Sequence, residues 1–249
     1  MNFFITLSGK RVKQGFFIVV ISFFTALFYF SQASVHVPVL SGKDGPKAIY
    51  KGDKGIALTF NIGWGDVQAE PILEILEKEK VESATFFLSG SWAERHPDLV
   101  DKIKKMGFEI GSLGYAYEDY TEIEEEKIRR DINRSIEVLK KLDIKEVKLL
   151  RSPTGHFDKR SLKIADELGL TVVHWSLNSQ DWKNPGVDAI VKEVKKVRKG
   201  DIVLMHASDS AVQTAKALPE VLSIIREKGE MVTISHLIAN GKVKTTIIP

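Results

Sequence analysis

The chain has 249 residues, with 36 Lys and Arg against 33 Asp and Glu, six His and no Cys. Its 43% hydrophobic and 28% charged residues are typical of a globular protein and exclude a collagen-like or low-complexity chain. The formal charge of +3 is too small and dispersed for a nucleic-acid partner, and the lack of Cys excludes disulfides and thiolate metal sites.

An apolar stretch without charges covers 15–30 and follows Lys10, Arg11 and Lys13, as in export signals. The uncharged run continues to Val35, and about 20 residues are enough for a transmembrane anchor. A cleaved signal peptide is the alternative, because Ser31-Gln32-Ala33 resembles a cleavage site. Residues 1–35 are therefore expected to form a cytoplasmic stub with an anchor or signal peptide. Either reading predicts an extracytoplasmic location for the rest, membrane-anchored or secreted.

The next segment, 36–50, is rich in Pro, Gly and Lys and lacks a period, which predicts a linker. From there to 240, short β-branched runs alternate with amphipathic helical runs, and 241–249 is expected to be a tail. The predicted strands are Ile56 to Asn61, Ala84 to Leu88, Phe108 to Ser112, Val147 to Arg151, Thr171 to Trp175, Asp201 to His206 and Met231 to Ile234. This alternation predicts an α/β fold of parallel strands, and we favour a (β/α) barrel of seven or eight strands over an open sheet.

Polar residues gather where these strands end, and a barrel would bring them to one mouth. They are Asn61 and Asp66, Ser112 and Tyr115, Arg151, then Asn178, Asp181 and Trp182, and finally His206. Taken singly, each has a structural explanation. Their shared position at strand ends favours a functional site.

Five short segments resemble, in order, the motifs of the NodB-homology polysaccharide deacetylases, carbohydrate esterase family 4. They are Thr59-Phe60-Asn61-Ile62-Gly63, Gly111-Ser112-Leu113-Gly114-Tyr115, Arg151-Ser152-Pro153-Thr154-Gly155, Asp181-Trp182 and Leu204-Met205-His206. The resemblance covers about 51–237 and is nearest to the sporulation-type branch with an N-terminal membrane segment. It implies a distorted (β/α) barrel that removes N-acetyl groups from cell-wall or other polysaccharides with a divalent metal such as zinc.

The positions that would carry this chemistry have changed. The family's base Asp corresponds to Asn61, and its three metal ligands correspond to Ile62, Leu113 and Tyr117. An amide accepts no proton at neutral pH, and Ile and Leu offer no lone pair. The resemblance therefore leads us to expect no metal cofactor. A replacement site using His156, His174 and His206 is less favoured, because His174 and Trp175 alternate along a strand.

Other positions keep the family pattern. The resemblance makes His206 the acid for the leaving amine and Arg151 the partner of the base, while Asn178 or Asp181 would orient His206. It places substrate contacts at Trp64, Tyr115, Pro153, Trp182 and Leu204. Because Asn61 is neutral, Arg151 lacks its ion-pair partner, which predicts an electropositive mouth suited to an anionic ligand unless Asp66 or Asp181 pairs with it.

Asp66 is the candidate replacement base, although a role as the cap of a helix that begins near Val67 is favoured for this residue. Two hypotheses remain for the function. The favoured one is a deacetylase-like protein, a pseudoenzyme, that binds cell-wall glycan such as peptidoglycan, including spore cortex, without the metal mechanism. The alternative is an active hydrolase with His206 as acid and Asp66 or Asp181 as base.

Overall fold

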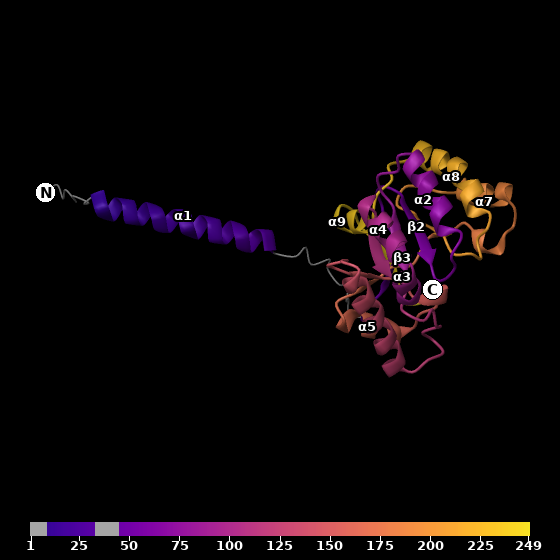
Figure 1. The fold of residues 1–249 in the computed structure, drawn as a ribbon, viewed down its shortest axis with the longest axis horizontal. Coiled ribbons are helices and arrows are strands. Elements are labelled where there is room, and N and C mark those ends of the chain that lie inside the picture. The colour runs from indigo at the N-terminus through magenta and orange to yellow at the C-terminus, as the bar shows by residue number, and fades with distance from the viewer. Residues whose placement is uncertain (1–8, 33–44) are drawn as a thin grey trace. The chain divides into compact units, whose positions relative to one another are not determined.

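The computed structural model describes residues 9–32 and 45–249 and divides the chain into two compact units, 1–38 and 39–249 (Figure 1). Within the first unit, α1 spans Gly9–Gln32. No helix in the described ranges is long and apolar enough to cross a membrane. The predicted transmembrane anchor is therefore not supported. Its predicted length required residues up to Val35, and 33–44, which also hold most of the predicted linker, lie outside the described residues.

The second unit is built on a sheet of seven parallel strands in the order β6-β5-β4-β3-β2-β8-β7. Their bounds are β2 Ala57–Ile62, β3 Thr85–Leu88, β4 Glu109–Ser112, β5 Leu149–Leu150, β6 Thr171–Val172, β7 Leu177–Asn178 and β8 Ile202–His206. The strands are short and nearly all buried, as expected for a parallel sheet covered on both sides.

Strong curvature of the sheet follows from its connectivity. The two edge strands, β6 and β7, are consecutive in the chain and are joined by residues 173–176 alone. Fully extended, the chain from Val172 to Leu177 spans at most about 18 Å. A flat sheet of seven strands would separate its edges by about 29 Å. The sheet is therefore a half-barrel of parallel strands, in keeping with the predicted distorted barrel.

The helices pack outside this half-barrel, and α2, α4, α7 and α8 lie around β2 and β3 in Figure 1. Their bounds are α2 Ala69–Lys78, α3 Gly90–Arg95, α4 Pro97–Lys105, α5 Glu125–Lys141, α6 Lys159–Glu167, α7 Val187–Val194, α8 Thr214–Lys228 and α9 Ile234–Ala239. Along β2, Leu58, Phe60 and Ile62 belong to the main apolar core with these helices. Since side chains alternate along a strand, Thr59 and Asn61 face the inner side.

One strand prediction was wrong, and one strand of the sheet was not predicted. Met231–Ile234 forms only a single bridge, from Met231 to Ile56, because Thr233 caps α9, which begins at Ile234. The seventh strand of the sheet is instead β7, a two-residue segment too short to show an alternating pattern. Outside the main sheet, β1 (Ala48–Lys51) pairs antiparallel with β9 (Lys244–Thr246), so both the predicted linker and the predicted tail contribute a strand.

Candidate functional site

The centre of the inner face is a buried arginine hydrogen-bonded only to neutral groups. Arg151 follows β5 and has no exposed surface. Its Nη1 donates to Thr59 Oγ1 at 2.8 Å and to Asn61 Oδ1 at 3.0 Å, and its Nε and Nη2 donate to the carbonyls of Val173 and His174 at 3.2 Å. In the described part of the chain, neither Asp66 nor Asp181 contacts this guanidinium.

Aromatic rings complete the surroundings of Arg151. Its guanidinium carbon lies 4.0 Å from the ring centre of Phe87 and 5.7 Å from that of Trp175. Burial lowers the pKa of Arg151 to about 9, so the side chain remains a cation at neutral pH. Ring faces and neutral acceptors stabilise the charge without cancelling it.

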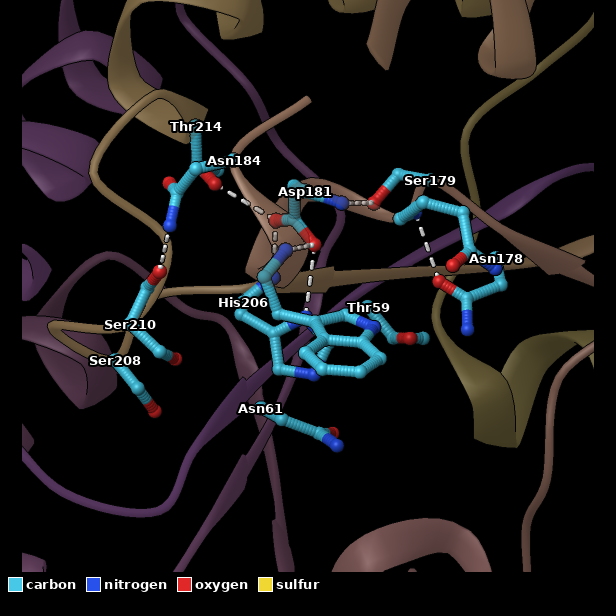
Figure 2. Close-up of polar contacts among 12 residues, drawn as sticks. Thr59, Asn61, Asn178, Ser179, Asp181, Asn184, His206, Ser208, Ser210 and Thr214 are labelled. Atoms are coloured by element: carbon cyan, nitrogen blue, oxygen red, sulfur yellow. Dashed lines mark hydrogen bonds and ion pairs between the residues drawn. The ribbon is translucent and has the colours of Figure 1, made fainter. Parts of the chain in front are cut away.

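A second polar cluster is centred on Asp181, which follows β7 in the short helix η2 (Asp181–Lys183) and is fully buried (Figure 2). Its Oδ1 accepts from His206 Nδ1 at 2.8 Å and from the Trp182 amide at 2.9 Å. Its Oδ2 accepts from the His206 amide and from Thr214 Oγ1, both at 2.7 Å. Burial acts to raise the pKa of Asp181, but the bonds from His206 and Thr214 outweigh it and leave this pKa below its usual value.

The two clusters meet at Asn61 and His206. These residues are register partners on the neighbouring parallel strands β2 and β8, so their side chains share the inner face. Arg151 holds the carbonyl of Asn61, and Asp181 holds Nδ1 of His206. Within the described residues, Asn61 Nδ2 and His206 Nε2 have no hydrogen-bond partner, and neither atom is sealed from solvent. Both nitrogens therefore remain available to a ligand at the mouth.

The residues that the motif resemblance assigns to the family's metal positions do not fit a metal ion. Ile62 is fully buried in the apolar core, and Leu113 is fully buried as well. The ring of Tyr117 packs so tightly on Gly63 that a Cβ there would lie 2.7 Å from Tyr117 Cε2. Burial raises the pKa of Tyr117, which keeps its hydroxyl protonated and a poor ligand. Ile62 and Leu113 therefore offer no lone pair to a metal, and Ile62 packs on the side of β2 that faces the helices.

Neither prediction for Asp66 agrees with the structure. Its side chain is 76% exposed, and its Oδ1 lies 2.8 Å from His96 Nε2, so it does not turn toward the mouth. It does not cap a helix either, because α2 begins at Ala69 after Gln68, with no side-chain cap. Asp209 instead accepts from the amides of residues 66–68, at 2.9 to 3.0 Å. Gly65, at φ +108°, makes room for that carboxylate.

The predicted substrate contacts differ in accessibility. Trp64 and Trp182 are 47% and 45% exposed, on loops that follow β2 and β7. Tyr115 is half-buried; its hydroxyl donates to Glu94 at 3.0 Å, and the Arg134 guanidinium lies 3.6 Å from its ring centre. Pro153 and Leu204 are buried. The two tryptophans are thus the exposed members of the predicted set, and both lie at the carboxyl edge of the sheet.

The remaining predicted positions have other local roles. Asn178 Oδ1 accepts from the amide of Gln180 at 2.9 Å, so Asp181 is the residue that contacts His206. His174 and Trp175 stack at 3.8 Å instead of alternating, because β6 ends at Val172. No group of three His, Cys, Asp or Glu that could hold a metal occurs in the described ranges.

Three residues of the site were missed as individual candidates. Thr59 binds Arg151, Thr214 binds Asp181, and Asp209 organises the Trp64 loop. Thr59 was detectable, because it lies two residues before Asn61 and so faces the same side of a strand. Asp209 and Thr214 act across more than 30 residues of chain, and no local pattern marks such contacts.

Known proteins resemble both the sequence and the fold. The sequence model of the polysaccharide deacetylase family matches residues 49–173. A peptidoglycan-N-acetylglucosamine deacetylase of Bacillus cereus is 36% identical over 191 residues, covering 75% of this chain and 89% of that protein. The uncharacterized protein YlxY of Bacillus subtilis is 32% identical over 202 residues, 80% of this chain but only 61% of that protein.

Among solved structures, a wild-type CE4 family pseudoenzyme from Bacillus anthracis superposes with a TM-score of 0.71 at 30% identity, over 80% of this chain and 71% of that one. A mutant of it, described as having restored enzymatic activity, gives the same TM-score over 77% and 71%. Sequence and fold agree, and the chain belongs to the polysaccharide deacetylase family.

Proposed function

We propose that this chain is a deacetylase-like protein that binds N-acetylated cell-wall glycan, such as peptidoglycan, without the divalent-metal mechanism of its family. The observation that carries the proposal is the filling of the metal positions: Ile62 lies in the apolar core, and the Tyr117 ring covers Gly63. The inner face nevertheless keeps an ordered polar site around Arg151 and His206, which is what a binding function requires.

The resemblance of the motifs supports the metal part of this proposal. Asp and His ligands bind zinc through oxygen and nitrogen lone pairs, which Ile62 and Leu113 lack. Restoring such ligands at Ile62 requires placing a carboxylate in a core formed by the sheet and the helices. The similar pseudoenzyme from Bacillus anthracis supports the view that this fold persists in proteins without the family's activity.

Exposed aromatic side chains support a glycan as ligand. Trp64 and Trp182 are about half exposed although they are the largest side-chain type, and they flank the site on loops after β2 and β7. Aromatic rings that combine an apolar face with a polar edge are enriched at binding surfaces. The similar Bacillus cereus protein is a peptidoglycan-N-acetylglucosamine deacetylase, which makes peptidoglycan the glycan to test first.

The alternative, an active hydrolase, is supported by the His206–Asp181 pair, which resembles the family's acid and its orienting carboxylate. It lacks a base. Asp66 contacts His96 at the surface, and both oxygens of Asp181 already accept hydrogen bonds. Asn61 holds no proton-accepting group at neutral pH. We therefore favour binding over hydrolysis.

An extracytoplasmic location remains part of the proposal, supported by basic residues ahead of the apolar stretch at 15–30. A role in spore cortex rests on the resemblance to the sporulation-type branch alone.

The test is co-sedimentation of the full chain with insoluble, N-acetylated peptidoglycan. The native chain is expected to sediment with the wall, and Trp64→Ala and Trp182→Ala each to weaken binding by about 1 kcal/mol, or about fivefold. Val67→Ala, an exposed apolar residue in the Trp64 loop, is the matched control with binding unchanged. The proposal is contradicted if the native chain does not sediment with the wall, or if both Trp variants sediment as much as the native chain does.

A further inference from the structure

The inner face presents hydrogen-bond donors where the resemblance expects an accepting carboxylate. Arg151 Nη1 donates to Asn61 Oδ1, which fixes the orientation of the amide, because the opposite orientation would bring two donors together. Nδ2 of Asn61 consequently points away from the guanidinium. This nitrogen has no hydrogen-bond partner in the described chain, although Asn61 is only 5% exposed.

The positive charge beneath this amide lacks a neutralising partner among the residues that the structure describes. Arg151 contacts a hydroxyl, an amide oxygen and two carbonyls, all of them neutral. A buried charge without a counterion is costly, and its field reaches further than it would in water. An anion placed against Asn61 Nδ2 would relieve that cost.

Four nearby acidic side chains form hydrogen bonds or ion pairs with groups other than Arg151. Asp181 accepts four hydrogen bonds, including two from His206. Asp119 contacts His156, and Asp209 accepts from the amides of residues 66–68. Asp66 contacts His96 at the surface.

The imidazole of His174, whose backbone carbonyl accepts from Arg151, does not neutralise the cation. Burial, followed by the charges of Arg151 and His156, lowers the pKa of His174 to about 4, so it is neutral at pH 7.

A second available nitrogen lies beside Asn61. His206 is its register partner on β8, is 8% exposed, and directs Nδ1 to Asp181, which leaves Nε2 for a ligand. The two side chains come from register partners on adjacent strands, whose backbones lie about 4.8 Å apart, so that one small anionic group can contact both.

We propose that Asn61 Nδ2, held and polarised by the buried cation Arg151, binds an oxyanion carried by the glycan, a carboxylate or a phosphate, with His206 Nε2 beside it. The inference rests on the proposed function and narrows its ligand to acidic wall glycans. Donation through Asn61 strengthens the outer bond, since hydrogen bonds in series polarise one another. The carboxylate source to test is muramic acid, and the phosphate source is a sugar phosphate.

The experiment uses the full chain and calorimetric titration with matched ligands. N-acetylmuramic acid is compared with its methyl ester, which has the same sugar and no charge, and N-acetylglucosamine 1-phosphate is compared with N-acetylglucosamine. Each anion is expected to bind about tenfold more tightly than its neutral match, because attraction to a nearby buried cation exceeds the energy of a tenfold change. If only one anion shows the preference, it identifies the source.

The decisive variant is Asn61→Asp, which supplies the missing counterion to Arg151. It is expected to remove the tenfold preference for the acid over its methyl ester. Lys192→Gln, an exposed residue on α7, changes net charge equally and is expected to keep the preference. Equal binding of acid and ester by the native chain, or a preference that survives in Asn61→Asp, overturns this inference while glycan binding stands. Failure of all four sugars to bind overturns both proposals.

Discussion

Arg151 Nη1 donates to Asn61 Oδ1 over 3.0 Å, so a buried cation is paired with a neutral amide. An aspartate at position 61 would form an ion pair with Arg151 in the same geometry, whereas the asparagine amide carries no charge. The inner face of the half-barrel therefore carries a fixed positive charge. The next measurements follow from this pair and from the contacts around it.

Asn61→Asp is expected to stabilise the fold by about 2 kcal/mol at pH 7, because an uncompensated buried charge gains a partner in hydrogen-bonding distance. Urea unfolding of native chain and variant measures the difference. Asn133→Asp, an exposed change on α5 with the same change in charge, is expected to stay within about 0.5 kcal/mol of the native chain. A destabilised Asn61→Asp variant would mean that Arg151 is already neutralised.

Asp181→Ala is expected to destabilise the fold by about 3–5 kcal/mol, since it leaves buried donors on His206, Trp182 and Thr214 without acceptors. Urea unfolding again gives the value. Asp188→Ala, an exposed carboxylate on α7, is the control and should change stability by less than about 0.5 kcal/mol. A loss below about 1 kcal/mol for Asp181→Ala would argue against a cluster held by this carboxylate.

Acid should reveal the contact between Asp119 and His156. Burial opposes ionisation, but hydrogen bonds from His156 and Thr121 outweigh it and lower the pKa of Asp119 to about 2. The unfolded value is about 3.9, so the stabilisation is complete above that pH and is lost as the pH falls toward 2. Asp119→Asn is expected to be about 2 kcal/mol less stable than the native chain at pH 7, with the gap closing near pH 2. A gap of equal size at both pH values contradicts this assignment.

The metal positions can be tested by restoring ligands. The triple variant carries Ile62→Asp, Leu113→His and Tyr117→His. Zinc at a hundredfold excess over its Kd is expected to stabilise this variant by about 2.7 kcal/mol, which is measured as a rise in the midpoint of thermal unfolding. The zinc-free variant should be less stable than the native chain, because Ile62 lies in the apolar core. Ile62→Asp alone is the control, destabilised and not rescued by zinc. A folded triple variant indifferent to zinc would mean that these are not the metal positions.

The main sheet was predictable where the strands are long enough to show a pattern. Leu58, Phe60 and Ile62 alternate with Thr59 and Asn61, and the predicted strand Ile56 to Asn61 overlaps β2 almost entirely. The two-residue strand β7 carries no such signal, and the run Met231 to Ile234 was taken for a strand although a helix cap interrupts it. Short segments are decided by tertiary pairing, which a local pattern does not contain.

In the site, too, the positions at strand ends were predictable from the sequence, and the contacts between distant residues were not. The positions of Arg151, Asp181 and His206 at strand ends predicted a shared location, because parallel strands deliver their ends to one edge. The direction of Asp66 was not predictable, since it depends on His96, and on Asp209 holding its loop. Both partners are distant in sequence. A glycine-flanked loop offers many conformations, and only the folded neighbours select one.

The most direct test of the central claim is release of acetate from N-acetylated peptidoglycan by the full chain, measured without added metal and with Zn²⁺, Co²⁺ or Mn²⁺. We expect wall binding with no acetate above the protein-free control under any of these conditions, because the motif resemblance places Asn61 at the base position and Ile62, Leu113 and Tyr117 at the metal positions. Acetate release that depends on one of these metals and is lost in His206→Ala would contradict it.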